Sequence, residues 1–342
     1  MLRRFTLPLF LTIILLLFFV SGCSILPINQ EVEEKVSNLS ADSILVNSDE
    51  IKLQTLNLIE NAQKAIFIQL SSLNDPEILN SIMKKSHDGI DVRILLDQWQ
   101  RDNSSTVSTL KNNNVSVQYY PSQKGQYQRV RYMVADYSKA IFYGVDWTNK
   151  GFSSYFMAVK LSGDTAWKIT KSFVKDWLYT TTMNLEIPKE IDLPEENISF
   201  AINTTIRQQI IGNITSSQSD IKIIVEQLSD SDTVDALLEA KTRGIDIKLI
   251  LSPSTAIATP NTLKKLIEAE IDIRYNSHSE EHPMNFNLGI FDGKQVIISS
   301  SSWTYYAFVI NHESSLTIPS PEVVNKLDKI FAEEWENGTT TP

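Results

Sequence analysis

The sequence predicts an α/β protein built of two similar lobes, and an internal repeat is the strongest observation behind this prediction. Residues 89–96 (Gly-Ile-Asp-Val-Arg-Ile-Leu-Leu) recur as residues 244–251 (Gly-Ile-Asp-Ile-Lys-Leu-Ile-Leu), at an offset of 155 residues. Asp136 recurs as Asp292, at an offset of 156 residues. A repeat this long exceeds the roughly 20–50 residues of a solenoid unit, and each copy can hold a core of its own. A site at the junction of the copies would therefore be pseudo-symmetric.

Helical and strand patterns alternate within each copy. Residues 49–63 place apolar side chains at helical spacing, and residues 65–70 form a nearly continuous apolar run, as in a strand covered on both faces. The first copy continues with predicted helices at 76–87, 107–113 and 164–179 and strands at 91–96, 115–119, 130–135, 140–143 and 154–161. The second copy repeats the order, with helices at 205–217, 232–243, 262–270 and 322–336 and strands at 221–226, 246–251, 271–274, 286–291, 295–299 and 313–318. Such alternation favours sheets covered by helices.

The N-terminus predicts a targeting segment. Two arginines at positions 3 and 4 precede an apolar run over residues 5–20, which is shorter than the roughly 20 residues of a membrane-spanning helix. The run ends in Val20-Ser21-Gly22-Cys23, which resembles the lipobox of bacterial lipoproteins. The resemblance implies cleavage before Cys23 and lipid attached to it; an uncleaved anchor helix is the alternative. Either way, we expect an extracytoplasmic protein anchored to a membrane, on the cell surface or the periplasmic side.

Cysteine content and charge exclude several classes of protein. Cys23 is the only cysteine, so an intrachain disulfide and a cysteine-based metal cluster are impossible. Residues 1–22 hold two arginines and no acidic residue, so the remaining chain carries 29 basic and 41 acidic side chains, a net charge of −12. Such a field does not attract nucleic acid. We expect no nucleic-acid partner, no cofactor and no metal ion.

Composition also marks the boundaries between segments. The stretch after Cys23 is polar and acidic, and residues 181–198 carry Pro188, Pro194 and five acidic side chains, as in an exposed linker. The predicted organisation is a signal peptide (1–22), a tether (23–44), lobe one (45–180), a linker (181–198), lobe two (199–337) and a frayed tail (338–342).

The repeated unit resembles the phospholipase D superfamily. Residues 89–97 (Gly-Ile-Asp-Val-Arg-Ile-Leu-Leu-Asp) follow a strand and a helix, as in that family, and the resemblance covers about residues 45–337. The lobe endings at 173–177 (Phe-Val-Lys-Asp-Trp) and 331–335 (Phe-Ala-Glu-Glu-Trp) resemble the cardiolipin synthase branch. The resemblance implies two pseudo-symmetric lobes within one chain, each a mixed β-sheet flanked by helices. It also implies one His-x-Lys-x4-Asp-x6-Gly-(Gly/Ser)-x-Asn motif in each lobe.

The first copy departs from this motif at the histidine and lysine positions. If Asp136 matches the motif aspartate, Arg129 falls on the histidine and Arg131 on the lysine. Gly144 then matches a motif glycine, and Asp146 falls on the asparagine.

The second copy departs in the same places. If Asp292 matches the aspartate, Asn285 falls on the histidine and Asn287 on the lysine. Ser300 then falls on the motif serine and Ser302 on the asparagine. Neither motif histidine is therefore present.

The family chemistry explains what this implies. In the family, one histidine attacks phosphorus, and its partner protonates the leaving alcohol and then activates water. Arginine stays protonated and asparagine does not titrate, so neither residue can take these roles. We therefore expect a catalytically inactive protein that binds a phosphate-bearing ligand, such as a phospholipid head group, or acts as an envelope scaffold. The candidate ligand-binding residues are Arg129, Arg131, Asn285, Asn287, Ser300 and Ser302.

The two arginines have two interpretations. Arg129 and Arg131 are two residues apart on a predicted strand and share a face, and arginine grips phosphate with two parallel hydrogen bonds. Alternatively, they pair with Asp136, Asp146 or Asp292 and fill an unused pocket. The two motif aspartates lie in predicted turns, where aspartate often serves only the backbone.

Other histidines keep an enzymatic alternative open. His87 is expected at a helix end, whereas His278 and His282 lie in an acidic loop before the second motif and His312 adjoins Glu313. A divergent phospholipase D or phosphatidyltransferase-type phosphodiesterase could use one of the last three. A histidine side chain within hydrogen-bonding reach of the motif positions would favour that alternative. The repeat-matched tryptophans are expected in the cores: Trp147, Trp177, Trp303 and Trp335.

Overall fold

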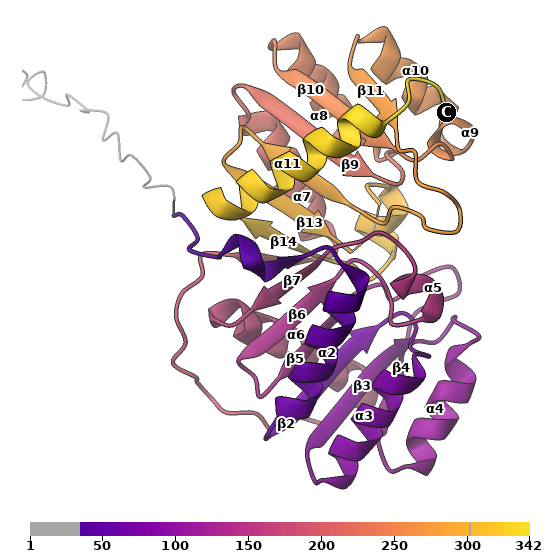
Figure 1. Ribbon diagram of the computed structural model, residues 1–342, viewed down its shortest axis with the longest axis vertical. Helices are drawn as coiled ribbons and strands as arrows, with labels where there is room; N and C mark the ends of the chain where they lie inside the picture. The colour runs from indigo at the N-terminus through magenta and orange to yellow at the C-terminus, as the bar shows by residue number, and fades with distance from the viewer. Residues whose placement is uncertain (1–34, 301) are drawn as a thin grey trace, which may run out of the picture. The chain divides into compact units, whose positions relative to one another are not determined.

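The computed structural model describes residues 35–300 and 302–342. The predicted signal peptide, Cys23 and the first part of the tether lie outside the described residues. Residues from Val36 to Pro342 form one compact unit, which contains two seven-stranded sheets flanked by helices (Figure 1).

The first lobe is a mixed sheet with the strand order β1-β7-β6-β5-β2-β3-β4. Strands β2, β3 and β4 run parallel, and the other pairings are antiparallel. The strands are β1 (Ile44–Leu45), β2 (Ala65–Leu70), β3 (Asp91–Asp97), β4 (Ser116–Tyr120), β5 (Tyr132–Ala135), β6 (Lys139–Tyr143) and β7 (Ala158–Leu161). The helices are α2 (Ser48–Asn61), α3 (Pro76–His87), α4 (Asn103–Asn112), α5 (Asn149–Phe152) and α6 (Asp164–Thr181), after a short 3-10 turn, η1 (Ala41–Ser43).

The second lobe repeats this plan with the order β11-β10-β9-β12-β13-β14-β8. Its strands are β8 (Ser199–Ile202), β9 (Asp220–Val225), β10 (Asp246–Leu251), β11 (Asp272–Tyr275), β12 (Leu288–Phe291), β13 (Gln295–Ser299) and β14 (Ser314–Ile318). Its helices are α7 (Thr204–Ser216), α8 (Ser231–Thr242), α9 (Thr255–Ala258), α10 (Pro260–Glu268) and α11 (Pro321–Asn337), with a π-helical turn, η2 (Tyr306–Ile310). The predicted fold class, two pseudo-symmetric lobes that each hold a mixed sheet, is confirmed.

Three hydrophobic clusters form the core, one within each lobe and one between the lobes. Helices α2, α3 and α4 bury apolar side chains against one face of the first sheet, and α7, α8 and α10 do the same in the second lobe. The third cluster joins the lobes, because α6 and α11 pack with residues from the facing sides of both sheets. Trp147 and Trp303 are fully buried, one in each outer cluster, as the repeat predicts. A continuous core therefore fixes the junction where a shared site would lie.

The elements that sequence reasoning missed are short. β1 has two residues and β8 has four, too few for an alternating strand pattern or a helical pattern of apolar residues to be recognised. β7 begins at Ala158 rather than at residue 154, because Tyr155 instead bridges to Met284 in the other lobe.

The packed unit begins before the predicted end of the tether. The Ser37 N–H donates to the Pro319 carbonyl oxygen at 2.8 Å, and Lys326 Nζ donates to the carbonyl oxygen of Ile44 at 2.8 Å. Thr339, in the predicted tail, exchanges backbone hydrogen bonds with Tyr275 at 2.7 and 2.9 Å. Both ends of the packed unit are therefore attached to lobe two.

Over the described ranges, 35–300 and 302–342, the helices are too short or too polar to cross a bilayer.

Candidate functional site

The structure brings some of the motif positions of the two lobes to one cavity of about 570 Å³. Arg131, Gly144 and Asp146 line it from lobe one, and Asn285 and Glu226 from lobe two. The backbones approach closely here, since a Cβ on Gly144 would lie only 3.3 Å from the carbonyl oxygen of Asn285. We call this cavity the motif cleft. Its lining is not pseudo-symmetric, because the residues matched to Arg131, Gly144, Asp146 and Asn285 (Asn287, Ser300, Ser302 and Arg129) do not line it.

Arg131 is held by groups of the protein itself. Its Nε lies 3.2 Å from Asp146 Oδ2, and its guanidinium donates to the Ser300 carbonyl oxygen. Asp146 is fixed in turn, because its Oδ1 accepts the N–H groups of Ser71 and Ser72 at 2.8 and 3.1 Å. The side chains of Arg131 and Asp146 are 12% and 18% exposed. This is the pairing that sequence reasoning offered as the alternative to phosphate binding.

Arg129 is placed differently. Its guanidinium lies 5.4 Å from the centroid of the Tyr127 ring, and its backbone N–H donates to the His312 carbonyl oxygen at 2.7 Å. The half-buried side chain forms no ion pair with any residue of the described chain. Burial raises the pKa of nearby Asp97, and the positive charge of Arg129 offsets part of that rise.

Apart from Asn285, the polar positions of the second motif contact carboxylates or are buried. Ser300 Oγ donates to Glu313 Oε2 at 2.5 Å, and Ser302 Oγ donates to Glu226 Oε2 at 3.4 Å. Asn287 is 8% exposed, and its Oδ1 has no hydrogen-bond partner among the described residues. Of these predicted ligand-binding residues, the two serines are engaged by acids.

The two motif aspartates serve the backbone. Asp136 accepts the N–H groups of three consecutive residues, Gln63, Lys64 and Ala65, at 2.7 to 3.1 Å. Asp292 accepts those of the matched residues Gln218, Ser219 and Asp220 at 2.8 to 3.2 Å. Each carboxylate thus joins a strand-end turn to the segment that starts a central strand.

The pKa of Asp292 is lowered by these contacts. Burial acts to raise it, but the N–H groups of Ser219, Gln218 and Asp220 and the Ser219 hydroxyl stabilise the carboxylate and prevail.

His312 belongs to a polar network between the lobes and not to the motif cleft. Its Nε2 lies 2.7 Å from Asp176 Oδ2, and its Nδ1 lies 3.1 Å from Asn203 Oδ1. Gln69 Nε2 also donates to Asp176 Oδ2, at 2.9 Å, and the His312 ring stacks on Tyr120 with centroids 4.6 Å apart. Both ring nitrogens are occupied, so neither can attack phosphorus in this arrangement.

The side chains of the remaining histidines also form no hydrogen bond with the motif arginines among the described residues. His278 Nε2 lies 2.9 Å from Glu334 Oε2, and His87 is exposed at the end of α3. His282 Nδ1 lies 2.8 Å from the Ser153 carbonyl oxygen. Within the described chain, no histidine side chain forms a hydrogen bond with Arg129, Arg131 or Asn285.

Sequence reasoning missed three charged residues of the motif cleft. Lys150, Glu226 and Glu280 line it with Arg131 and Asp146, so carboxylates outnumber cations. Glu226 was detectable as the acid that follows the buried strand β9. Lys150 and Glu280 lie in segments without periodicity, and their convergence depends on how the two lobes pack.

The comparisons with known proteins agree with this geometry. A family model described as "Cardiolipin synthase, PLD-like domain" matches residues 55–204 and 210–335. The chain is 23% identical over 128 residues to a mitochondrial cardiolipin hydrolase of Danio rerio, which covers 37% of this chain and 56% of the relative. A homologous hydrolase of Chlamydomonas reinhardtii is 20% identical over 141 residues, 41% of this chain and 62% of the relative. The chain thus spans about three fifths of the length of these relatives.

Solved structures share the two-lobed fold. A phosphatidylserine synthase from Haemophilus influenzae superposes with a TM-score of 0.72 at 14% identity, covering 89% of this chain and 88% of the other. A polyphosphate kinase from Porphyromonas gingivalis superposes with a TM-score of 0.63 at 12% identity, covering 86% of this chain and 47% of the other. At these identities the likeness concerns the fold alone.

Proposed function

We propose that this chain, which belongs to the family of cardiolipin synthase, PLD-like domains, acts by binding rather than by hydrolysis of phosphodiesters. In this proposal the protein is a membrane-tethered scaffold of the cell envelope whose motif cleft has lost its catalytic groups. The observation that carries the proposal is that groups of the protein already bind the guanidinium of Arg131. It occupies the position of the motif lysine, and Asp146 and the Ser300 carbonyl already hold its guanidinium.

The charges of the cleft favour a scaffold over a phosphate site at this place. Three carboxylates, Asp146, Glu226 and Glu280, line the cleft with two cations, Arg131 and Lys150, and this excess of negative charge repels a phosphate. Proton transfer to a leaving alcohol also needs a group that titrates near neutrality, which arginine and asparagine lack. Arg129 remains the one motif cation for which the described residues supply no ion pair.

A phosphodiesterase that uses His282 is the second candidate, and one contact favours it. His282 Nδ1 is oriented by the Ser153 carbonyl oxygen, and Nε2 has no hydrogen-bond partner among the described residues. The neighbouring residues Glu280 and Pro283 line the motif cleft. An imidazole held this way has the orientation that nucleophilic catalysis uses.

Hydrolysis of a chromogenic phosphodiester separates the two candidates. The chain from Ser24, which contains the whole compact unit, is compared with an Arg129→Ala/Arg131→Ala variant and with His282→Ala. We expect product release at the level of the buffer blank in all three, because no motif histidine is present. Release by the parent that disappears in His282→Ala would overturn the proposal and establish the second candidate.

The membrane tether has its own test. Cys23→Ser is expected to abolish lipid incorporation and to move the protein from the membrane to the soluble fraction, because only Cys23 can carry a thioether-linked lipid. Metabolic labelling with a fatty acid and fractionation measure both effects, and Ser24→Ala, which keeps the cysteine, is the control. Cys23→Ser protein that stays in the membrane would indicate an uncleaved anchor helix instead.

A further inference from the structure

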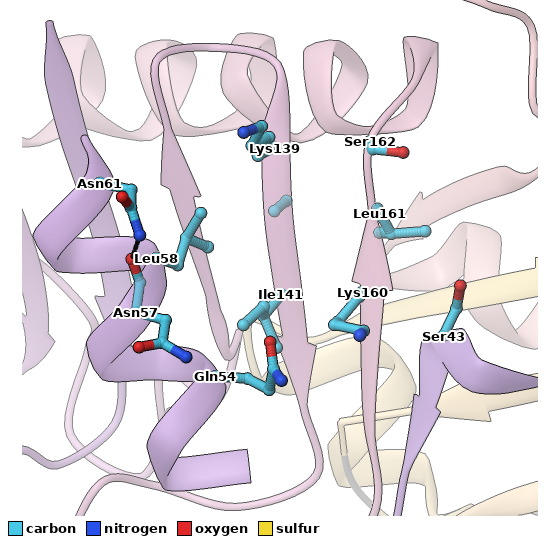
Figure 2. A pocket seen from close by; sticks show the side chains of 11 residues that line it. Ser43, Gln54, Asn57, Leu58, Asn61, Lys139, Ile141, Lys160, Leu161 and Ser162 are labelled. Carbon is cyan, nitrogen blue, oxygen red and sulfur yellow. Dashed lines mark hydrogen bonds between the residues drawn. The ribbon is translucent and has the colours of Figure 1, made fainter. Parts of the chain in front are cut away.

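A second cavity lies in lobe one and shares no lining residue with the motif cleft. It has a volume of about 580 Å³ and lies beside α2, over strands β6 and β7 (Figure 2). We call it the α2 groove. No acidic side chain lines it, whereas two lysines do, Lys139 and Lys160. This is unusual for a chain with a net charge of −10.

Strand register places both lysines on the face of the sheet that α2 covers. Ile141 of β6 pairs with Lys160 of β7 across the antiparallel ladder, so their side chains point to the same face. Lys139 lies two residues before Ile141 and therefore shares that face. Lys139 and Lys160 are diagonal neighbours, about 7–8 Å apart at the backbone. Two long side chains at this separation can reach one phosphate.

Helix α2 forms the polar wall of the groove. Gln54, Asn57 and Asn61 are spaced by three and four residues and line one side of it, as Figure 2 shows. Asn61 Nδ2 is engaged by the Asn57 carbonyl oxygen at 2.7 Å. The side-chain amides of Gln54 and Asn57 form no hydrogen bond within the described residues and can serve the hydroxyls of a ligand. Ile141, on the sheet, supplies an apolar floor.

In lobe two, the polar side chains at the position equivalent to the α2 groove bond to one another. The residue matched to Gln54 is Gln209, and the strand pairing matches Lys160 to Thr317. Thr317 Oγ1 donates to Gln209 Oε1 at 3.0 Å, and Gln209 Nε2 donates to Ser199 Oγ at 2.7 Å. The polar side chains of lobe two thus satisfy one another.

The residue of lobe two matched to Lys139 is also engaged within the protein. It is Gln295, and its amide donates to Asn213 Oδ1 on α7. In lobe one the matched lysines have no ion pair or hydrogen bond among the described residues. A half-buried ammonium such as that of Lys160 gains most from an anion that enters the groove.

We propose that the α2 groove of lobe one binds a phosphorylated polyol, with Lys139 and Lys160 on the phosphate and the amides of Gln54 and Asn57 on the hydroxyls. The ligand is either a soluble polyol phosphate or the head group of a lipid such as phosphatidylglycerol. The site does not depend on whether the motif cleft is catalytic.

Calorimetric titration of the chain from Ser24 with sn-glycerol 3-phosphate tests the site. The sharpest variant is Lys139→Gln/Lys160→Thr, which installs the residues that close the groove in lobe two. We expect it to weaken binding at least tenfold while thermal unfolding stays unchanged. Lys171→Ala/Lys175→Ala, which removes the same charge from the exposed face of α6, is expected to bind like the parent.

Three further titrants identify the ligand class. Inorganic phosphate is expected to bind at least tenfold more weakly than glycerol 3-phosphate, and glycerol not at all. Vesicles of phosphatidylglycerol, compared with phosphatidylcholine, show whether the head group is accepted within a membrane; binding of either source supports the site. The proposal is overturned if the parent binds no polyol phosphate, if both double variants bind alike, or if inorganic phosphate binds as tightly. Phosphodiester hydrolysis by the parent would sink the proposed function without affecting this result.

Discussion

Asp176→Ala is expected to lower the free energy of unfolding by about 3–5 kcal/mol, because it breaks a buried pair and leaves one partner unsatisfied. Asp176 lies on α6 of lobe one. Its Oδ2 contacts His312 Nε2 of lobe two and accepts a hydrogen bond from Gln69 Nε2 of β2. Tyr132, fully buried, donates to Gln69 Oε1 at 2.8 Å, so the loss extends into the core of lobe one. The network joins the two lobes, and its loss should loosen their junction.

Urea unfolding, followed by circular dichroism, measures this change. Lys175→Ala is the matched control, since it removes a neighbouring charged side chain that is exposed, and surface changes of this kind stay within about 0.5 kcal/mol. Gln69→Ala should reproduce part of the loss. Equal stability of Asp176→Ala and Lys175→Ala would show that the network contributes nothing.

Asp292→Ala is the second large change, with an expected loss of roughly 2–3 kcal/mol. Three backbone N–H groups at the start of β9 lose their shared acceptor, and each unsatisfied donor is costly where water replaces the carboxylate poorly. The repeat predicts a similar loss for Asp136→Ala, whose carboxylate accepts the matched N–H groups in lobe one. Asp292→Asn keeps one acceptor oxygen and should lose less than Asp292→Ala.

The pH dependence of stability provides a separate readout of Asp292. Its pKa in the folded protein is lowered from the ordinary 3.8, so its contribution is fully present above that value. The contribution is lost as the pH falls below 3.8 and through the lower folded value. Acid unfolding curves of the parent and of Asp292→Asn should therefore converge in that range. A constant difference between the two curves would contradict the assigned role of the carboxylate.

The sequence predicted the large elements well because each has strong local patterning. Apolar runs located the central strands, and the boundaries of α3, β2, β10 and β13 agree with the structure. Edge strands β1 and β8 were missed, because their place depends on pairing with β7 and β14. Short edge strands carry little periodic signal of their own.

Sequence reasoning named two residues that line the motif cleft but did not predict the charge of the cleft. Motif spacing placed Arg131 and Asn285 at the lobe junction, and both line one cavity. Asp146 was among the partners considered for Arg131. Glu280 and the interlobe pairing of His312 with Asp176 depend on contacts between residues more than a hundred positions apart, which no local pattern records.

The central claim, that the motif cleft does not hydrolyse phosphodiesters, is tested most directly by 31P NMR of phosphatidylglycerol vesicles incubated with the chain from Ser24. An active member of the phospholipase D superfamily serves as the positive control on the same vesicles. We predict that the phosphodiester resonance keeps its intensity and that no phosphatidic acid resonance develops, since arginine and asparagine stand at the two motif positions where hydrolysis needs histidine. Steady growth of the phosphatidic acid resonance in proportion to protein concentration would contradict the claim.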